Sequence, residues 1–273
     1  MPFTLAHPAA VLPLVRTPLS TVALVAGAVA PDLPYFVGSV GIAASAQSWY
    51  EPFLNATTAH SPRGMLTVDL AYALALYWLA RAVRRPVGTL LPGLASARRR
   101  HGDGARGSPA RAWWVLVSLL SGITTHLVWD SFTHADGYVV DHVSWLTSSL
   151  AGELTWARAL QHASTVVGLA AIGVYAWRRR SRLSPGPIGR RRRLVLLGVL
   201  GAVVVGGAGA SAASGWAGAA GLSTGRLVEV VLSDGAKGGG GAFLGALVLY
   251  TAAWWVHHVT VSARPRRADA PRT

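Results

Sequence analysis

The sequence contains no cysteine among its 273 residues. Disulfides and thiolate metal sites are therefore excluded, and any bound metal has to be held by His, Asp, Glu or backbone oxygens. Charged residues are also scarce, at 13% of the chain, whereas hydrophobic residues make up 52%. Soluble domains carry about 25% charged residues. This balance argues against a water-soluble domain and indicates a membrane protein.

Lysine is almost missing as well. Lys237 is the only one, so the net charge of +14 comes almost entirely from arginine. The arginines form blocks between apolar runs, and no aromatic residues alternate with them in a base-stacking pattern. Such blocks are typical of cytoplasmic loops that face anionic headgroups. We therefore expect the lipid bilayer as partner and no nucleic acid. The heavy use of Ala, Gly and Arg suggests a bacterial inner membrane as the location.

Six long apolar segments predict an all-α fold, a polytopic transmembrane helical bundle. They cover residues 19–30, 66–82, 112–130, 160–177, 194–210 and 242–259. The first is too short to cross a bilayer unless the residues before Arg16 contribute. We expect residues 1–182 to form a membrane domain that carries the His and Asp motifs, and residues 183–273 to add a membrane hairpin with a basic tail.

The arginine blocks orient this bundle. They lie between the second and third segments, between the fourth and fifth, and after the sixth, whereas residues 32–62 and 130–153 contain no Lys or Arg. By the positive-inside rule, both termini are expected in the cytoplasm. Pro31 directly after Ala28-Val29-Ala30, and the lack of Lys or Arg before the first apolar residues, predict that the N-terminal segment is not a cleaved signal peptide.

Most of the His and Asp residues then lie on the extracytoplasmic side. His126, Asp130 and His134 recur every four residues at the end of the third apolar segment, which places them near one face of a helix. Asp32 and His60 lie at the ends of other expected spans. Ionisable groups at membrane depth are costly and are by default functional. Imidazole and carboxylate together predict a metal site or an acid–base pair.

Plainer interpretations stay open on the sequence alone. Asp32, between two prolines, would fit a turn or a helix cap, and His60 would fit a loop. Asp69, inside the second segment, would fit an ion pair with Arg63. The residues from His126 onward would fit an interfacial helix end that reaches water.

Several motifs carry a resemblance to a known family. They are the opening MPFTLAHPAA, the APDLPY turn at residues 30–35, His60-Ser61 and the run from Thr125 to His134. Together they resemble the DUF4184 family of uncharacterised membrane proteins, and Gln161-His162 also fits it. The resemblance covers about the first two-thirds of the chain and implies a fold and a topology, but no activity.

The order of the motifs is also distantly similar to the DUF457-type membrane-bound metal-dependent hydrolases. That similarity implies a metal site, for which our candidates are His7, Asp32, His60, His126, Asp130 and His162. His7 conflicts with the expected topology, which places it near the cytoplasm. It could join the others only if the prolines around it break the N-terminal segment into a re-entrant piece.

The leading hypothesis is a metal-dependent hydrolase that acts at the extracytoplasmic face on a lipid-linked or phosphoester substrate. A divalent ion, zinc in this hypothesis, would activate water. His126, Asp130 and Asp32 would be ligands, and His60 and His134 would be further ligands or the catalytic base and acid. The alternatives are an ion or small-solute transporter, for which the sequence shows no internal repeat, and a non-catalytic membrane scaffold. The sequence does not indicate an oligomeric state.

Overall fold

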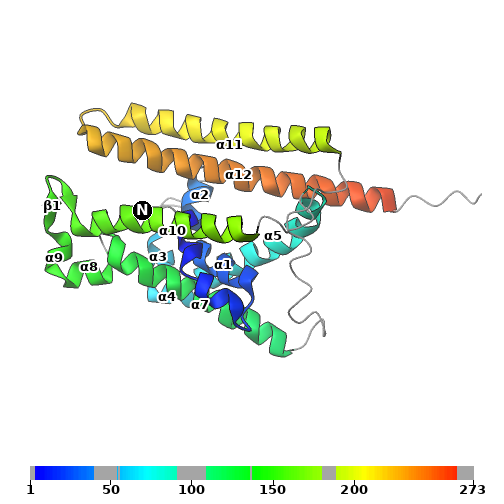
Figure 1. The fold of residues 1–273 in the computed structure, drawn as a ribbon, viewed down its shortest axis with the longest axis horizontal. Coiled ribbons are helices and arrows are strands. Elements are labelled where there is room, and N and C mark those ends of the chain that lie inside the picture. The colour runs from blue at the N-terminus through cyan, green and yellow to red at the C-terminus, as the bar shows by residue number, and fades with distance from the viewer. Residues whose placement is uncertain are drawn as a thin grey trace, which may run out of the picture.

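The computed structural model describes residues 4–39, 54, 56–90, 109–135, 137–179 and 189–262. The described part is almost entirely helical, which confirms the all-α class (Figure 1). One short antiparallel hairpin departs from it, where β1 (Ser149–Ala151) pairs with β2 (Leu154–Thr155). This hairpin leads directly into the fourth expected span.

The helices follow one another in this order: the 3₁₀ helices η1 (Thr4–Ala9) and η2 (Leu12–Arg16), then α1 (Thr21–Val29), η3 (Ala30–Asp32), α2 (Leu33–Ser39), α3 (Ala56–Ala59), α4 (Pro62–Leu66), α5 (Val68–Leu90), α7 (Pro109–Thr133), α8 (Tyr138–His142), α9 (Ser144–Thr147), α10 (Trp156–Arg179), α11 (Arg190–Gly218) and α12 (Thr224–Ser262). Prolines interrupt the N-terminal segment, so that it folds as two short 3₁₀ helices instead of one long helix.

Five helical stretches among the described residues are long and apolar enough to cross a membrane. They are Thr21–Ser39, Pro109–His142, Trp156–Arg179, Arg190–Gly218 and Thr224–Val261. Each overlaps one of the expected spans, and the chain is an integral membrane protein by this measure. The first stretch gains its length from η3 and α2, which follow residue 30, and not from the residues before Arg16.

The remaining expected span, residues 66–82, falls on α5. This helix is long enough for a bilayer, at 23 residues. It is not among the five stretches above, because Asp69 near its start and a group of arginines near its end interrupt its apolar character. A sixth crossing by α5 therefore stays a prediction.

The basic helix ends gather at one end of the molecule. In Figure 1 the C-terminal end of α5, the N-terminal end of α7 and the C-terminal end of α10 lie toward the right, together with the N-terminal end of α11. The helices α8 and α9 and the β hairpin lie at the opposite end. This arrangement agrees with the alternation of the arginine blocks along the sequence, while the side of the membrane on which each end lies stays a prediction.

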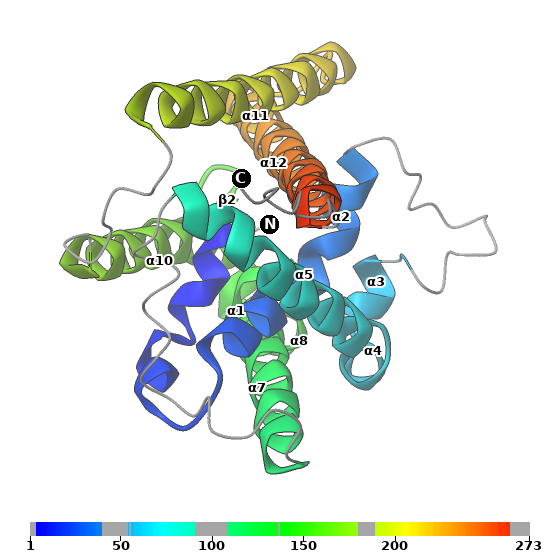
Figure 2. The ribbon, with the colours of Figure 1, turned by 90° about the vertical axis from the view of Figure 1, so that its right-hand side faces the viewer.

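Helix α1 occupies the middle of the first part of the chain, as the view along the long axis shows (Figure 2). It crosses α7 at Gly27 and Gly122, where a Cβ on either glycine would overlap the backbone of the opposite helix. The N-terminal helix η1 packs against α10, where a Cβ on Gly168 would lie 3.0 Å from the Cβ of Ala6. These close approaches bring η1, α1 and α7 together around one interior region.

The two C-terminal helices pack along each other as a hairpin (Figures 1 and 2). α12 also contacts the rest of the chain, since Ser39 donates to the Lys237 carbonyl at 3.0 Å and the Trp255 indole donates to the Ala82 carbonyl at 3.2 Å. The expected boundary between residues 182 and 183 lies outside the described residues, so the division into two membrane units stays a prediction.

Candidate metal centre

Asp32, His60, His126 and Asp130 converge in the interior of the bundle. Asp32 ends η3, His60 lies in the turn between α3 and α4, and the other two lie one helical turn apart on α7. One potential ligand atom from each of the four lies within 4.8 Å of all the others, so the cluster could hold a metal ion. Asp32, His126 and Asp130 are buried, and the His60 side chain is 20% exposed.

Local structure fixes His60 in this position. The turn from α3 to α4 is closed by Ser61, whose hydroxyl accepts from the Gly64 amide at 3.0 Å and caps α4. A Cβ on Gly64 would overlap the Thr58 carbonyl. Glycine at position 64 therefore permits the tight turn that directs His60 toward α7.

The His126 ring is held in one orientation and one tautomer. Its Nδ1 lies 2.8 Å from the Ala28 carbonyl oxygen, which can only accept a hydrogen bond. Nδ1 therefore carries a proton, and in the neutral ring Nε2 presents its lone pair to the cluster. A backbone carbonyl that orients a histidine through its second nitrogen is typical of metal-ligating histidines. The bond depends on the close crossing of α1 and α7.

Five of the six separations among the four ligand atoms are close to those of a tetrahedral metal site. His126 Nε2 lies 3.1 Å from Asp130 Oδ2 and 3.7 Å from Asp32 Oδ1. His60 Nε2 lies 3.3 Å from Asp130 Oδ2, 3.4 Å from Asp32 Oδ1 and 3.4 Å from His126 Nε2. Two ligands bound at about 2.0–2.1 Å to one tetrahedral ion are about 3.3–3.4 Å apart. The two carboxylate oxygens lie within 4.8 Å of each other, so the four residues could together hold a metal ion.

His7 joins the cluster, which resolves the conflict with its expected position. The η1 helix carries it into the interior, where its ring stacks on His126 with centroids 3.8 Å apart. His7 Nε2 lies 3.4 Å from Asp130 Oδ1. Burial, followed by the neighbouring His126, lowers the pKa of His7 to about 4. The ring is neutral at pH 7, which is the form that binds a metal.

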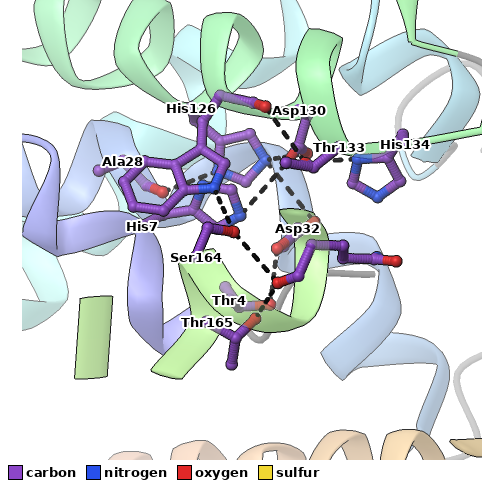
Figure 3. A network of polar contacts seen from close by, with 12 residues as sticks. Thr4, His7, Ala28, Asp32, His126, Asp130, Thr133, His134, Ser164 and Thr165 are labelled. Atoms are coloured by element: carbon purple, nitrogen blue, oxygen red, sulfur yellow. Dashed lines mark hydrogen bonds and ion pairs between the residues drawn. The ribbon is translucent and has the colours of Figure 1, made fainter. Parts of the chain in front are cut away.

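His134 also reaches the site, although it lies just beyond the end of α7. Its Nδ1 is 3.3 Å from Asp130 Oδ1, and its side chain is 19% exposed. Figure 3 shows the imidazoles of His7, His126 and His134 grouped around the Asp130 carboxylate. Asp130 is therefore the central residue of the whole cluster.

Thr4 was missed by the sequence analysis. Its hydroxyl donates to Asp32 Oδ2 at 2.6 Å, which leaves Asp32 Oδ1 directed at the imidazoles (Figure 3). Thr4 and His7 are three residues apart, and a 3₁₀ helix places such residues on one face. This spacing was visible in the sequence, but it becomes informative only once residues 4–9 are known to form a 3₁₀ helix.

Two further residues behave differently from what the sequence led us to expect. His162 was a candidate ligand, but it is exposed on α10 and makes no contact with the cluster in the described structure. Asp69 was open to an ion pair with Arg63, but Asp69 is fully buried and Arg63 is exposed. Neither Asp69 oxygen has a hydrogen-bond partner among the described residues.

Comparison with known proteins gives a family and no activity. Neither a curated protein nor a solved structure matches the chain. The model of DUF4184, a domain of unknown function, matches residues 1–252 and thus includes every residue of the cluster. The chain therefore belongs to the DUF4184 family.

Proposed function

We propose that this membrane protein is a metal-dependent hydrolase whose site opens to the extracytoplasmic face and takes a lipid-linked or phosphoester substrate. The observation that carries the proposal is the convergence of Asp32, His60, His126 and Asp130 at one interior point, with a ligand atom of each within 4.8 Å of the others. Zinc fits best, because imidazole and carboxylate at this spacing are ligands that it prefers.

The charges of the site support a bound cation. Asp32 and Asp130 are buried beside each other, and among the described residues their ion-pair partners are histidines and neither Lys nor Arg. Buried carboxylates are costly unless positive charge offsets them. A divalent ion between them supplies that charge and leaves the histidines neutral.

The exposed edge of the cluster supports hydrolysis. A divalent ion in such a site supplies an activated water nucleophile at neutral pH and polarises the scissile group. His126, Asp32 and Asp130 hold the ion. His60, which reaches solvent, accepts the proton of the attacking water at Nε2. His134, the other imidazole that reaches solvent, returns a proton to the leaving oxygen.

The outer side of α7 supports a substrate with a lipid chain. Val128 and Phe132 on α7 are 53% and 47% exposed, and they are spaced by one helical turn. Each lies two residues from Asp130, so both point away from the cluster. This apolar outer face suits a helix in contact with lipid, and a site carried by such a helix suits a molecule that diffuses in the bilayer.

Metal content and turnover of the purified protein in detergent test the proposal. We expect bound metal, together with release of product from an aryl phosphodiester or from a long-chain lipid phosphate in mixed micelles. His126→Ala and Asp130→Ala should lose both. His162→Ala is the matched control, because this exposed histidine lies outside the cluster, and it should keep both. Wild-type protein that never binds metal would overturn the proposal, and ion flux into proteoliposomes without hydrolysis would favour a transporter.

A further inference from the structure

The Asp130 carboxylate contacts imidazoles through both of its oxygens. Oδ2 lies 3.1 Å from His126 Nε2 and 3.3 Å from His60 Nε2, on the side of the ion proposed above. Oδ1 lies 3.4 Å from His7 Nε2 and 3.3 Å from His134 Nδ1. The second pair of distances matches the separation of about 3.3–3.4 Å that two ligands of one tetrahedral ion have.

The residues on the Oδ1 side lack other partners. Neither ring nitrogen of His7 makes a hydrogen bond within the described structure, although this side chain is almost completely buried. His134 Nδ1 and both Asp130 oxygens are likewise buried without a hydrogen bond there. Buried polar atoms are nearly always satisfied in native proteins, so several such atoms gathered at one point indicate a missing ligand.

We propose that a second divalent cation binds between His7 Nε2, Asp130 Oδ1 and His134 Nδ1, and that Asp130 bridges it to the first cation. This inference rests on the proposed function, since it assumes the first ion. Carboxylate-bridged two-metal sites place their ions about 3.5–4 Å apart and act on phosphoesters by stabilising both the attacking and the leaving oxygen. His134 then serves as a ligand, and His60 remains the proton acceptor.

Each position has three protein ligand atoms when His60 Nε2 is kept as the proton acceptor. The first cation would be held by Asp32, His126 and Asp130 Oδ2, and the second by His7, Asp130 Oδ1 and His134. A site with three protein ligands keeps a position open for water or substrate. The first cation, beside His60, would therefore hold the attacking water, and the second, beside the partly exposed His134, would contact the phosphoester group.

The test measures metal stoichiometry and metal–metal coupling in the full-length protein, loaded with Mn²⁺ in detergent and freed of excess ion. We expect two Mn²⁺ per chain and an exchange-coupled electron paramagnetic resonance spectrum. His134→Ala should retain one Mn²⁺ with an uncoupled spectrum, and this change at a helix end leaves the interior packing intact. His7→Ala should do the same, and Asp130→Ala should lose both ions. His162→Ala is the control and should keep both.

The outcomes distinguish a failure of the second cation site from a failure of the proposed function. One ion per chain, unchanged in His134→Ala and His7→Ala, would overturn the second site and leave the first standing. Two ions without coupling, or two ions retained in His134→Ala, would place the second ion elsewhere and overturn it as well. No bound ion in the wild-type protein would overturn the proposed function itself.

Discussion

Thr4 gives the sharpest single test of how the proposed site is built, because it lies outside the proposed ligands and hydrogen-bonds to one of them, Asp32. Its hydroxyl donates to Asp32 Oδ2 at 2.6 Å in a buried environment. That length falls in the range of about 2.5–2.7 Å for a hydroxyl bonded to an ionised carboxylate. Thr4→Val removes the hydroxyl and keeps the shape of the side chain. It leaves Asp32 free to turn Oδ1 away from the imidazoles.

The expected size of the effect follows from the kind of bond that is lost. A hydrogen bond to a charged group contributes about 1.5–3 kcal/mol. Changes in the groups that orient metal ligands typically weaken metal affinity by about 10–100-fold, which corresponds to about 1.4–2.7 kcal/mol. The two estimates of the lost free energy agree. We therefore expect Thr4→Val to raise the Kd for zinc by about 10–100-fold.

Competition with a chromogenic chelator in detergent solution measures this Kd. Thr4→Ser keeps the hydroxyl and should bind zinc as the wild type does, which separates loss of the hydrogen bond from general damage to η1. The helical circular dichroism signal should be the same in all three proteins. Equal affinities in the wild type and Thr4→Val, within about twofold, would show that Thr4 does not position Asp32 and would refute the reasoning.

Three further predictions concern packing, metal and topology. Gly122→Ala should lower both Tm and metal content, because its Cβ overlaps the backbone of α1 and overpacking costs about 1–3 kcal/mol; Gly173→Ala on α10, with open space around it, should change neither. Removal of metal by a chelator should lower Tm in the wild type, since an ion at 100 times its Kd stabilises by about 2.7 kcal/mol, while His126→Ala should show no such shift. Because the chain has no cysteine, single cysteines report topology without background. Leu150→Cys in the β hairpin should react with an impermeant maleimide in intact cells and Thr260→Cys near the end of α12 only after permeabilisation, and the reverse pattern would invert the proposed orientation.

The sequence predicted the helical class and most of the expected spans because apolar length is a local property. It did not predict how the first span is completed. Apolar patterning ends near Ala30, where Pro31 follows, and this was interpreted as the end of the helix. In the structure a 3₁₀ turn carries the chain through Pro31 into α2. Pro31 is the second residue of this turn, and proline is tolerated in the first turn of a helix, where N–H groups have no partner within the helix.

The candidate ligands were predicted unequally well, for a physical reason. Helical periodicity alone placed His126 and Asp130 on one face of α7. The position of His7 depended on tertiary packing, because η1 lies closely against α10 at Gly168, where a Cβ would lie 3.0 Å from the Cβ of Ala6. His162 lies outside the cluster for the converse reason. Its place near the start of an apolar segment fixed its depth but not the direction in which its side chain points.

The geometry also weighs against the view that the cluster is only a scaffold for the helices. A structural role could be filled by apolar side chains of similar volume, which are often neutral or more stable than buried ionic groups. Here the Asp130 carboxylate is buried among four imidazoles, and neither of its oxygens makes a hydrogen bond within the described structure. Hydrogen-bonded polar contacts between membrane helices contribute only about 0.6 kcal/mol on average. The Asp130 carboxylate lacks these hydrogen bonds, and the burial of a charged group is itself costly. A cation would offset that cost, because it would satisfy both carboxylate oxygens and the facing lone pairs of the histidines at once.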